Sequence, residues 1–130
     1  MLLFGHRFIK SESFYHIQDS EAINNTPPSS MIFVEFSEDN LDIIEYLNLN
    51  EIVFALGVKN ITEVIYASSL NTSYIVIDKN LAITTQNIAN NYLFDSKILV
   101  SLDDEKEIEE MAILGVDGVI FPNAIIKITT

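Results

Sequence analysis

Four polar side chains stand where predicted buried strands end, and these side chains could do chemistry. They are two carboxylates, an amine and an amide: Glu35, Asp78, Lys59 and Asn123. In parallel α/β sheets and barrels, ligands collect at the carboxyl ends of the strands. We therefore take these four as candidate ligand-binding residues and assign no catalytic residue.

Glu35 is the most informative of the four. It shares one strand face with Phe33, and a strand of this class is covered on both faces, so its carboxylate must find partners or lose its charge. With Asp78 it could act in acid–base chemistry or offer hard oxygen ligands to a divalent cation. The alternative is that Glu35 reaches solvent or caps the next helix.

Other charged residues near strand ends have simpler interpretations. Lys59 and Lys79 follow strands in a chain poor in bases, so they could neutralise nearby acids or a bound anion, or be solvated. Asp103 and Asp104 precede a predicted helix, where acids are ordinary caps and partners of the helix dipole.

The two histidines, His6 and His16, lie in N-terminal segments that could form a hairpin. Together with Asp19 they would suit zinc or iron, but their spacing matches no metal signature, so we assign no metal and no cofactor. The chain also lacks the motifs G-x-x-x-x-G-K-[ST], G-x-G-x-x-G and G-x-S-x-G. Their absence argues against a glycine-rich nucleotide loop and against α/β-hydrolase chemistry.

The elements that must position these residues recur at a nearly constant interval. Predicted strands cover residues 32–36, 52–56, 74–78, 98–101 and 119–121, and their starts are 20, 22, 24 and 21 residues apart. Between them, residues 39–47, 60–70 and 81–93 have helical periodicity. The last of these carries Leu81, Thr84, Ile88, Ala89 and Tyr92 at helical spacing. The pattern predicts about five βα units in a mainly parallel sheet.

Residues 97–124 show the clearest sequence pattern of one such unit. Ile98, Leu99 and Val100 form an unbroken apolar run, which is typical of a parallel strand buried on both faces. Acidic residues follow where a helix is predicted to begin. Gly115 lies where this helix is predicted to end in a left-handed backbone conformation, and Pro122 ends the final strand. The unit is a strand, a crossover helix and a second strand.

Five units can be arranged in two ways. We favour a three-layer, flavodoxin- or Rossmann-like sheet, and the alternative is a half (βα) barrel whose concave face needs a partner to cover it. Residues 2–9 and 14–18 are expected to form an N-terminal hairpin or an extra strand, and residues 25–30 a linker. The whole chain, 1–130, is predicted to be one α/β domain, with an extended segment over 1–30 and the βα repeats over 31–130.

The net charge and the hydrophobic content limit the kinds of partner that the chain can bind. Seven basic residues face nineteen acidic ones, and the formal charge of −12 would repel phosphate backbones and anionic lipid. We therefore expect neither nucleic-acid nor membrane binding. The N-terminus is too short and too polar for a signal peptide or a spanning helix, so a cytoplasmic protein is expected. The 48% hydrophobic content indicates an apolar surface kept for a partner or for a second copy, as in a homodimer.

Two segments resemble known families. Residues 113–125, ILGVDGVIFPNAI, resemble the late strands of phosphate-binding (βα) barrels such as the keto-deoxy-phosphogluconate aldolases and the glycerophosphodiester phosphodiesterases. The resemblance implies an anion site after this strand, although Pro122-Asn123-Ala124 replaces the glycine-rich loop. No strand lysine matches the aldolase Schiff base, and no paired His or Glu-x-Asp matches the phosphodiesterases. Residues 73–78, SYIVID, resemble the central strand of receiver domains, which implies phosphotransfer to Asp78.

Two functions follow as hypotheses. The first is a non-catalytic interaction or regulatory domain that associates with itself or with a partner protein. The sequence has neither a glycine-rich loop nor a recognisable set of catalytic nucleophile and base, and residues 124–128 are apolar enough to pair with a neighbouring molecule. The alternative is an enzyme or sensor that binds a small ligand, such as a phosphorylated metabolite, through the acids at the strand ends.

Overall fold

Eight short strands form one parallel sheet in the structure, a computed structural model that describes residues 1–128. Their order across the sheet is β1-β7-β6-β5-β4-β3-β2-β8, and every neighbouring pair is parallel. The strands are β1 (Leu2–Phe4), β2 (Phe14–His16), β3 (Met31–Glu35), β4 (Phe54–Gly57), β5 (Tyr74–Asp78), β6 (Lys97–Ser101), β7 (Gly118–Ile120) and β8 (Ile125–Lys127).

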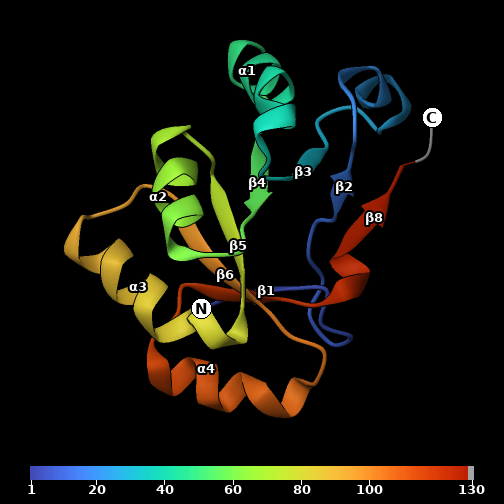
Figure 1. Ribbon diagram of the computed structural model, residues 1–130. Helices are drawn as coiled ribbons and strands as arrows, with labels where there is room; N and C mark the ends of the chain where they lie inside the picture. The colour runs from blue at the N-terminus through green and yellow to red at the C-terminus, as the bar shows by residue number, and fades with distance from the viewer. Residues whose placement is uncertain (129–130) are drawn as a thin grey trace.

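Four α-helices within residues 1–128 connect the central strands. They are α1 (Leu41–Leu49), α2 (Ile61–Ser69), α3 (Ala82–Asn91) and α4 (Ile108–Leu114). Short 3-10 helices precede or link them: η1 (Ser20–Asn25), η2 (Glu38–Asn40), η3 (Lys79–Leu81), η4 (Glu105–Glu107) and η5 (Pro122–Ala124). Figure 1 shows the α-helices following one another from the top of the view down the left to the bottom, while the strands β2 and β8 of the same sheet lie on the right. None of the helices in residues 1–128 has the length and apolar character needed to cross a bilayer.

The predicted parallel α/β class is confirmed, and the sheet is the curled half barrel rather than the three-layer arrangement that we favoured. The five predicted central strands are present as β3 to β7, with ends shifted by at most two residues. Strands β3 to β7 stay in sequential order across the sheet, whereas a doubly wound sheet reverses its order once. The predicted domain runs to Thr130, and residues 129–130 lie outside the described part.

The N-terminal segments are extra strands and not a hairpin. β1 pairs in parallel with β7, and β2 lies between β3 and β8, so the two strands are separated by most of the sheet. Residues 1–30 therefore contribute two strands to the sheet and are not merely an extended arm. A hairpin would have required antiparallel pairing of β1 with β2, and β7 and β3 take those edges instead.

The chain fills its own concave face. Inward-facing side chains form a buried cluster in which the rings of Phe4, Phe14 and Tyr74 meet edge to face at 5.3–5.6 Å between centroids. Phe14 is fully buried and Phe4 is 8% exposed. The expectation that a half barrel needs a partner on its inner face is therefore wrong here, because β1 and β2 carry aromatic side chains long enough to fill it.

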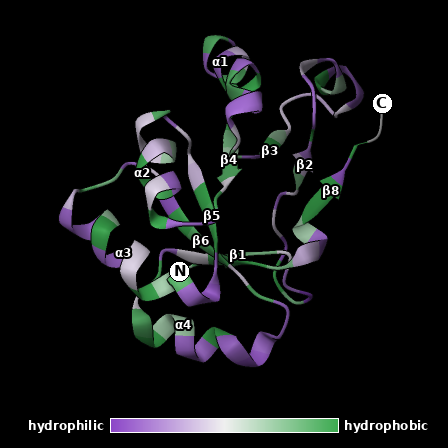
Figure 2. Ribbon diagram, in the orientation of Figure 1, coloured by the Kyte–Doolittle hydropathy of each residue, from purple (hydrophilic) through white to green (hydrophobic). Residues whose placement is uncertain are grey.

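The larger core lies between the outer face of the sheet and the helices. Figure 2 shows the hydrophobic residues concentrated in the strands, with hydrophilic and hydrophobic residues mixed along the helices. In α3 the residues that face the sheet are mostly small or polar: Ala82, Thr85, Gln86 and Ala89. Gln86 accepts a hydrogen bond from the backbone N–H of Asp117 at 2.9 Å. Tyr92 and Thr84, which the periodicity grouped with the apolar stripe, are exposed instead.

Candidate functional site

Six strands end in a residue that continues the concave face, and these residues form a polar rim around its open end. Side chains alternate between the two faces of a strand, so residues two positions apart share a face. On each of these strands, the residue two positions before the last one is apolar and belongs to the buried cluster of the concave face or packs against it. We call the following set the rim: His16, Glu35, Gly57, Asp78, Ser101 and Lys127. The concave face is thus apolar inside and polar at the carboxyl ends of its strands.

Glu35 lies over the backbone of β4. A Cβ atom added to its register partner Gly57 would be 2.6 Å from Oε2 of Glu35 and 2.7 Å from the ring of Phe33. The carboxylate therefore occupies the space that only glycine leaves open. Within residues 1–128 the side chain of Glu35 makes no hydrogen bond and no ion pair, and it is exposed.

His16 stands next to Glu35 on the neighbouring strand. Its ring meets Phe33 edge on, with 4.9 Å between centroids, and it is half-buried. Burial lowers the pKa of His16 and is the largest influence on it; Glu35 acts in the opposite sense, and Lys127 lowers the pKa further. The imidazole is therefore neutral at neutral pH, with a carboxylate and an ammonium group close enough to influence it.

Asp78 and Ser101 are register partners at the ends of β5 and β6. The side chain of Asp78 is exposed and does not cap the helix that follows it. The neighbouring Lys79 pairs instead with Glu107 and with Glu110, at 2.9 Å from the latter, and these hydrogen bonds raise its pKa. Lys79 is thus used to hold η3 against α4 and is not a counter-ion of Asp78.

The second histidine is tied into the fold. The backbone N–H of Phe8 donates to Nδ1 of His6 at 3.1 Å, so Nε2 carries the proton and faces Oε2 of Glu105 at 3.2 Å. Arg7 donates to both carboxylate oxygens of Glu105, at 3.0 and 2.8 Å, and these bonds lower the pKa of Glu105. Because both ring nitrogens are engaged, His6 acts here as a link between β1 and η4.

Two of the four residues predicted from the sequence lie on the rim and two do not. Glu35 and Asp78 are rim residues, separated by β4. Lys59 follows β4, and its backbone N–H bonds to Glu63 at 3.0 Å as part of the start of α2. Asn123 lies in η5, where its Oδ1 would be 2.7 Å from a Cβ added to Gly5. Within residues 1–128 no hydrogen bond or ion pair joins Lys59 or Asn123 to Glu35.

Among the other rim residues, two carry charged or titratable side chains: His16, which the sequence analysis considered only for a metal site with His6 and Asp19, and Lys127, which it did not consider. They lie on three-residue strands, and the signal that could have found them is the alternation Phe14-x-His16 and Ile125-x-Lys127. His6 and His16 do not form a common site, because one contacts Glu105 and the other Phe33. Among residues 1–128 no three His, Asp or Glu side chains are grouped so that they could hold a metal ion.

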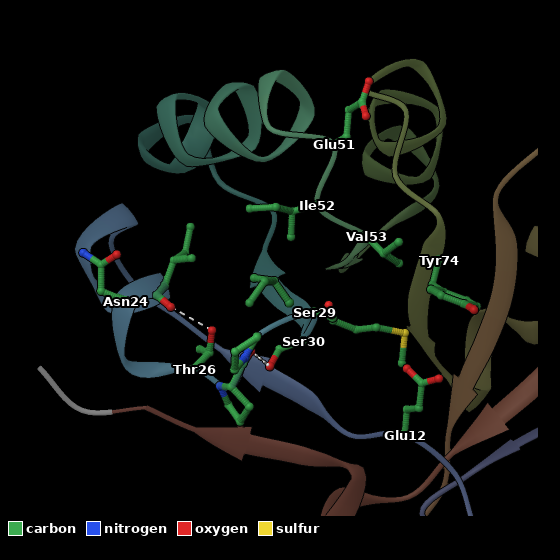
Figure 3. A pocket seen from close by; sticks show the side chains of 14 residues that line it. Glu12, Asn24, Thr26, Ser29, Ser30, Glu51, Ile52, Val53 and Tyr74 are labelled. Carbon is green, nitrogen blue, oxygen red and sulfur yellow. Dashed lines mark hydrogen bonds between the residues drawn. The ribbon is translucent and has the colours of Figure 1, made fainter.

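The two hollows of largest volume among those considered have other linings than the rim. One, of about 660 Å³, lies at the amino ends of β3 and β4; its hydroxyl groups at Thr26 and Ser30 bond to their own loop, and Glu12 and Glu51 lie at opposite edges (Figure 3). The other, of about 670 Å³, surrounds the His6 and Glu105 link. Neither brings an unengaged acid and an unengaged base together, because the first has no basic residue in its lining and the bases of the second, His6 and Arg7, are tied to Glu105.

The outer face of α3 differs from the rest of the surface. Residues 80–94 contain no charged side chain, although 20% of the chain is charged, and the other three α-helices of the described residues each carry at least one acid. We call the exposed side chains of α3 and of the two residues after it the α3 face: Ile83, Thr84, Asn87, Asn90, Asn91, Tyr92 and Leu93.

Leu93 ends this face in an unfavourable state. Its backbone adopts the left-handed conformation with φ of 55°, and its side chain is 84% exposed. A left-handed conformation costs a non-glycine residue about 1–2 kcal/mol, and an exposed leucine gains little from burial. The adjacent Tyr92 is 74% exposed. Two large apolar side chains are thus presented to solvent at the end of an uncharged helix.

No family model matches the chain, and no curated protein matches it either.

Proposed function

We propose that the protein is a non-catalytic interaction domain of the cytoplasm that associates with a second copy of itself through the α3 face. The observation that carries the proposal is the charge-free surface of α3 on a chain with a formal charge of −12. Two such chains repel each other, so they can meet closely only where neither presents a carboxylate. The cores of protein interfaces are likewise depleted of charge and enriched in tyrosine.

The chemistry of the α3 face suits a like partner. Asn87, Asn90 and Asn91 each carry a donor and an acceptor, and groups of this kind can pair with their own copies across a two-fold axis. Tyr92 and Leu93 supply the apolar anchors at one end, and Ile83, 58% exposed, lies at the other. The left-handed Leu93 is understandable if its exposed side chain is buried by the partner, because the contact offsets its backbone strain.

We propose a non-catalytic function because most of the potentially reactive side chains are held in ion pairs within the fold. His6 and Arg7 are tied to Glu105, and Lys79 is tied to Glu107 and Glu110. The concave face is occupied by Phe4, Phe14 and Tyr74.

The test is sedimentation equilibrium of the wild type and of two matched variants, each replacing an exposed apolar residue by aspartate. Leu93→Asp places a charge on the α3 face, whereas Ile113→Asp places the same charge on α4, where Ile113 is 80% exposed. We expect a wild-type dimer, a dissociation constant raised at least about tenfold by Leu93→Asp, and an unchanged dimer in Ile113→Asp. A monomeric wild type, or equal effects of the two substitutions, would overturn the proposal.

Leu93→Gly separates the strain from the contact. Glycine adopts the left-handed conformation freely, so the isolated monomer should become about 1 kcal/mol more stable, while the dimer should weaken because the side chain is lost. Urea unfolding at concentrations below the dissociation constant measures the first effect, and sedimentation measures the second. Opposite signs support the interface, and a variant that dimerises as strongly as the wild type contradicts it.

A further inference from the structure

A second surface, the rim, carries chemistry that the α3 face does not use. We propose that His16, Glu35 and Lys127 bind a small zwitterion, with the α-amino-acid group as the chemical class of ligand. Glu35 would accept hydrogen bonds from the ammonium group of the ligand, and Lys127 and His16 would donate to its carboxylate. The proposal rests on side chains of β2, β3 and β8 and is independent of the proposed dimer.

Charges of opposite sign stand on either side of His16. Lys127 is its register partner on β8, and Glu35 lies on β3, the other neighbour of β2. Both groups influence the imidazole electrostatically, yet they form no ion pair with each other. Their strands are separated by β2, which places the two backbones roughly 10 Å apart. The space over His16 is thus bordered by an anion on one side and a cation on the other.

His16, which lies between Glu35 and Lys127, can also bind a ligand. Burial lowers the pKa of His16, so at neutral pH its ring keeps one N–H that can donate and one nitrogen that can accept. Within residues 1–128 neither ring nitrogen takes part in a hydrogen bond, in contrast to His6. Gly57 leaves open the space in which the carboxylate of Glu35 lies.

The charge pattern discriminates between ligand classes. A simple anion would meet Glu35 and, across β4, Asp78, whereas a simple amine would meet Lys127. A molecule that carries an ammonium group and a carboxylate group on one carbon atom matches both sides, and a charged hydrogen bond forms with each group. Because both charged groups of the ligand are bound, the zwitterion should bind more tightly than a simple amine or a simple carboxylic acid.

The experiment follows the backbone amide signals of the ¹⁵N-labelled full chain by NMR while each of the twenty common L-amino acids is added to about ten times a millimolar dissociation constant. For the amino acid that gives the largest shifts, its decarboxylated amine and its deaminated acid are added as matched probes. We expect shifts at His16, Glu35, Gly57 and Lys127, and an affinity at least about tenfold weaker for both probes.

Matched variants locate the site. Glu35→Gln and Lys127→Met should each weaken binding at least about tenfold, whereas Glu38→Gln and Lys59→Met, which change the charge equally at exposed neighbouring positions, should leave it unchanged. Thermal unfolding of each variant checks that it folds. The proposal is overturned if no amino acid shifts the rim signals, if an amine or an acid alone binds as tightly, or if the control variants weaken binding equally.

Discussion

Two buried threonines of this chain are in opposite situations, and the difference is measurable. Thr72 donates its hydroxyl to backbone carbonyls, at 2.8 Å from that of Tyr74 and 3.1 Å from that of Phe54. Thr85 on α3 is fully buried, and its Oγ1 has no hydrogen-bond partner among the described residues. An unsatisfied buried hydroxyl is unfavourable, whereas a satisfied one contributes to stability.

Replacing each threonine by valine, which has nearly the same shape, should therefore change stability with opposite signs. We expect Thr85→Val to raise the free energy of unfolding by about 1 kcal/mol, and Thr72→Val to lower it by about the same amount or more. Urea unfolding of the two variants beside the wild type provides the measurement. If Thr85→Val is the more damaging of the pair, the hydroxyl has a partner that this account omits.

His16 makes stability depend on pH. Because burial lowers its pKa in the folded state below the ordinary value of 6.5, the unfolded chain binds more protons between those two pKa values. The contribution of His16 is therefore complete above about pH 6.5, decreases as the pH falls towards the folded pKa, and is constant below it. His16→Gln should remove this part of the slope in denaturant unfolding followed from about pH 7.5 to pH 5. An unchanged slope would show that His16 titrates normally.

At this scale the sequence predicted part of the site. Glu35 and Asp78 could be found because each ends a five-residue apolar strand. His16 and Lys127 were not placed at this site, because the alternation that marks them, Phe14-x-His16 and Ile125-x-Lys127, extends over only three residues and is a weak signal. The contact of His6 with Glu105 could not be predicted either, because Glu105 lies 99 residues away in the chain.

At Gly118, β7 lies very close to β1. A Cβ atom on Gly118 would lie 2.7 Å from Cβ of Leu2 and 2.8 Å from both its carbonyl oxygen and Cδ2 of Leu99. Gly118 therefore allows the N-terminal strand to dock. Since Phe4 is the last residue of β1, this docking also places its ring in the concave face.

Gly118→Ala should push β1 away from β7. We expect the free energy of unfolding to fall by about 1–3 kcal/mol, as in other over-packed sites. Hydrogen exchange of the Phe121 amide, which donates to the carbonyl of Phe4 at 2.9 Å, should accelerate beyond the global effect. Gly115→Ala is the control: its φ is 78° and no atom lies within 4 Å of the added Cβ, so it should cost about 1 kcal/mol without loosening β1. Equal acceleration in the control would contradict the role of Gly118.

Most elements could be predicted from the sequence, because apolar runs and caps such as Asn60, which accepts from the N–H of Glu63, are local signals. The orientation of α3 could not. Its apolar residues were grouped as the buried stripe, but small residues at Ala82 and Ala89 let the helix approach the sheet, and Tyr92 faces solvent. The order of β1, β2 and β8 likewise depends on contacts distant in sequence.

For the whole molecule, the sequence predicted the parallel class, and of its two arrangements the alternative, the half barrel, is found in place of the favoured three-layer sheet. The decisive features are side chains that meet only after folding: Phe4 and Phe14 fill the concave face, so this sheet needs no second layer there. The surface left for a partner is therefore outside the sheet. The charge-free α3 face is the part of it on which like-charged copies can meet.

A dilution series of the ¹⁵N-labelled wild type, followed by NMR, tests this central claim most directly. The account predicts that amide signals of residues 83–94 move with protein concentration and reach a plateau, while signals of β1, α4 and the rim stay constant. Signals that do not move at any concentration, or that move along the sheet edges and not along α3, would contradict it.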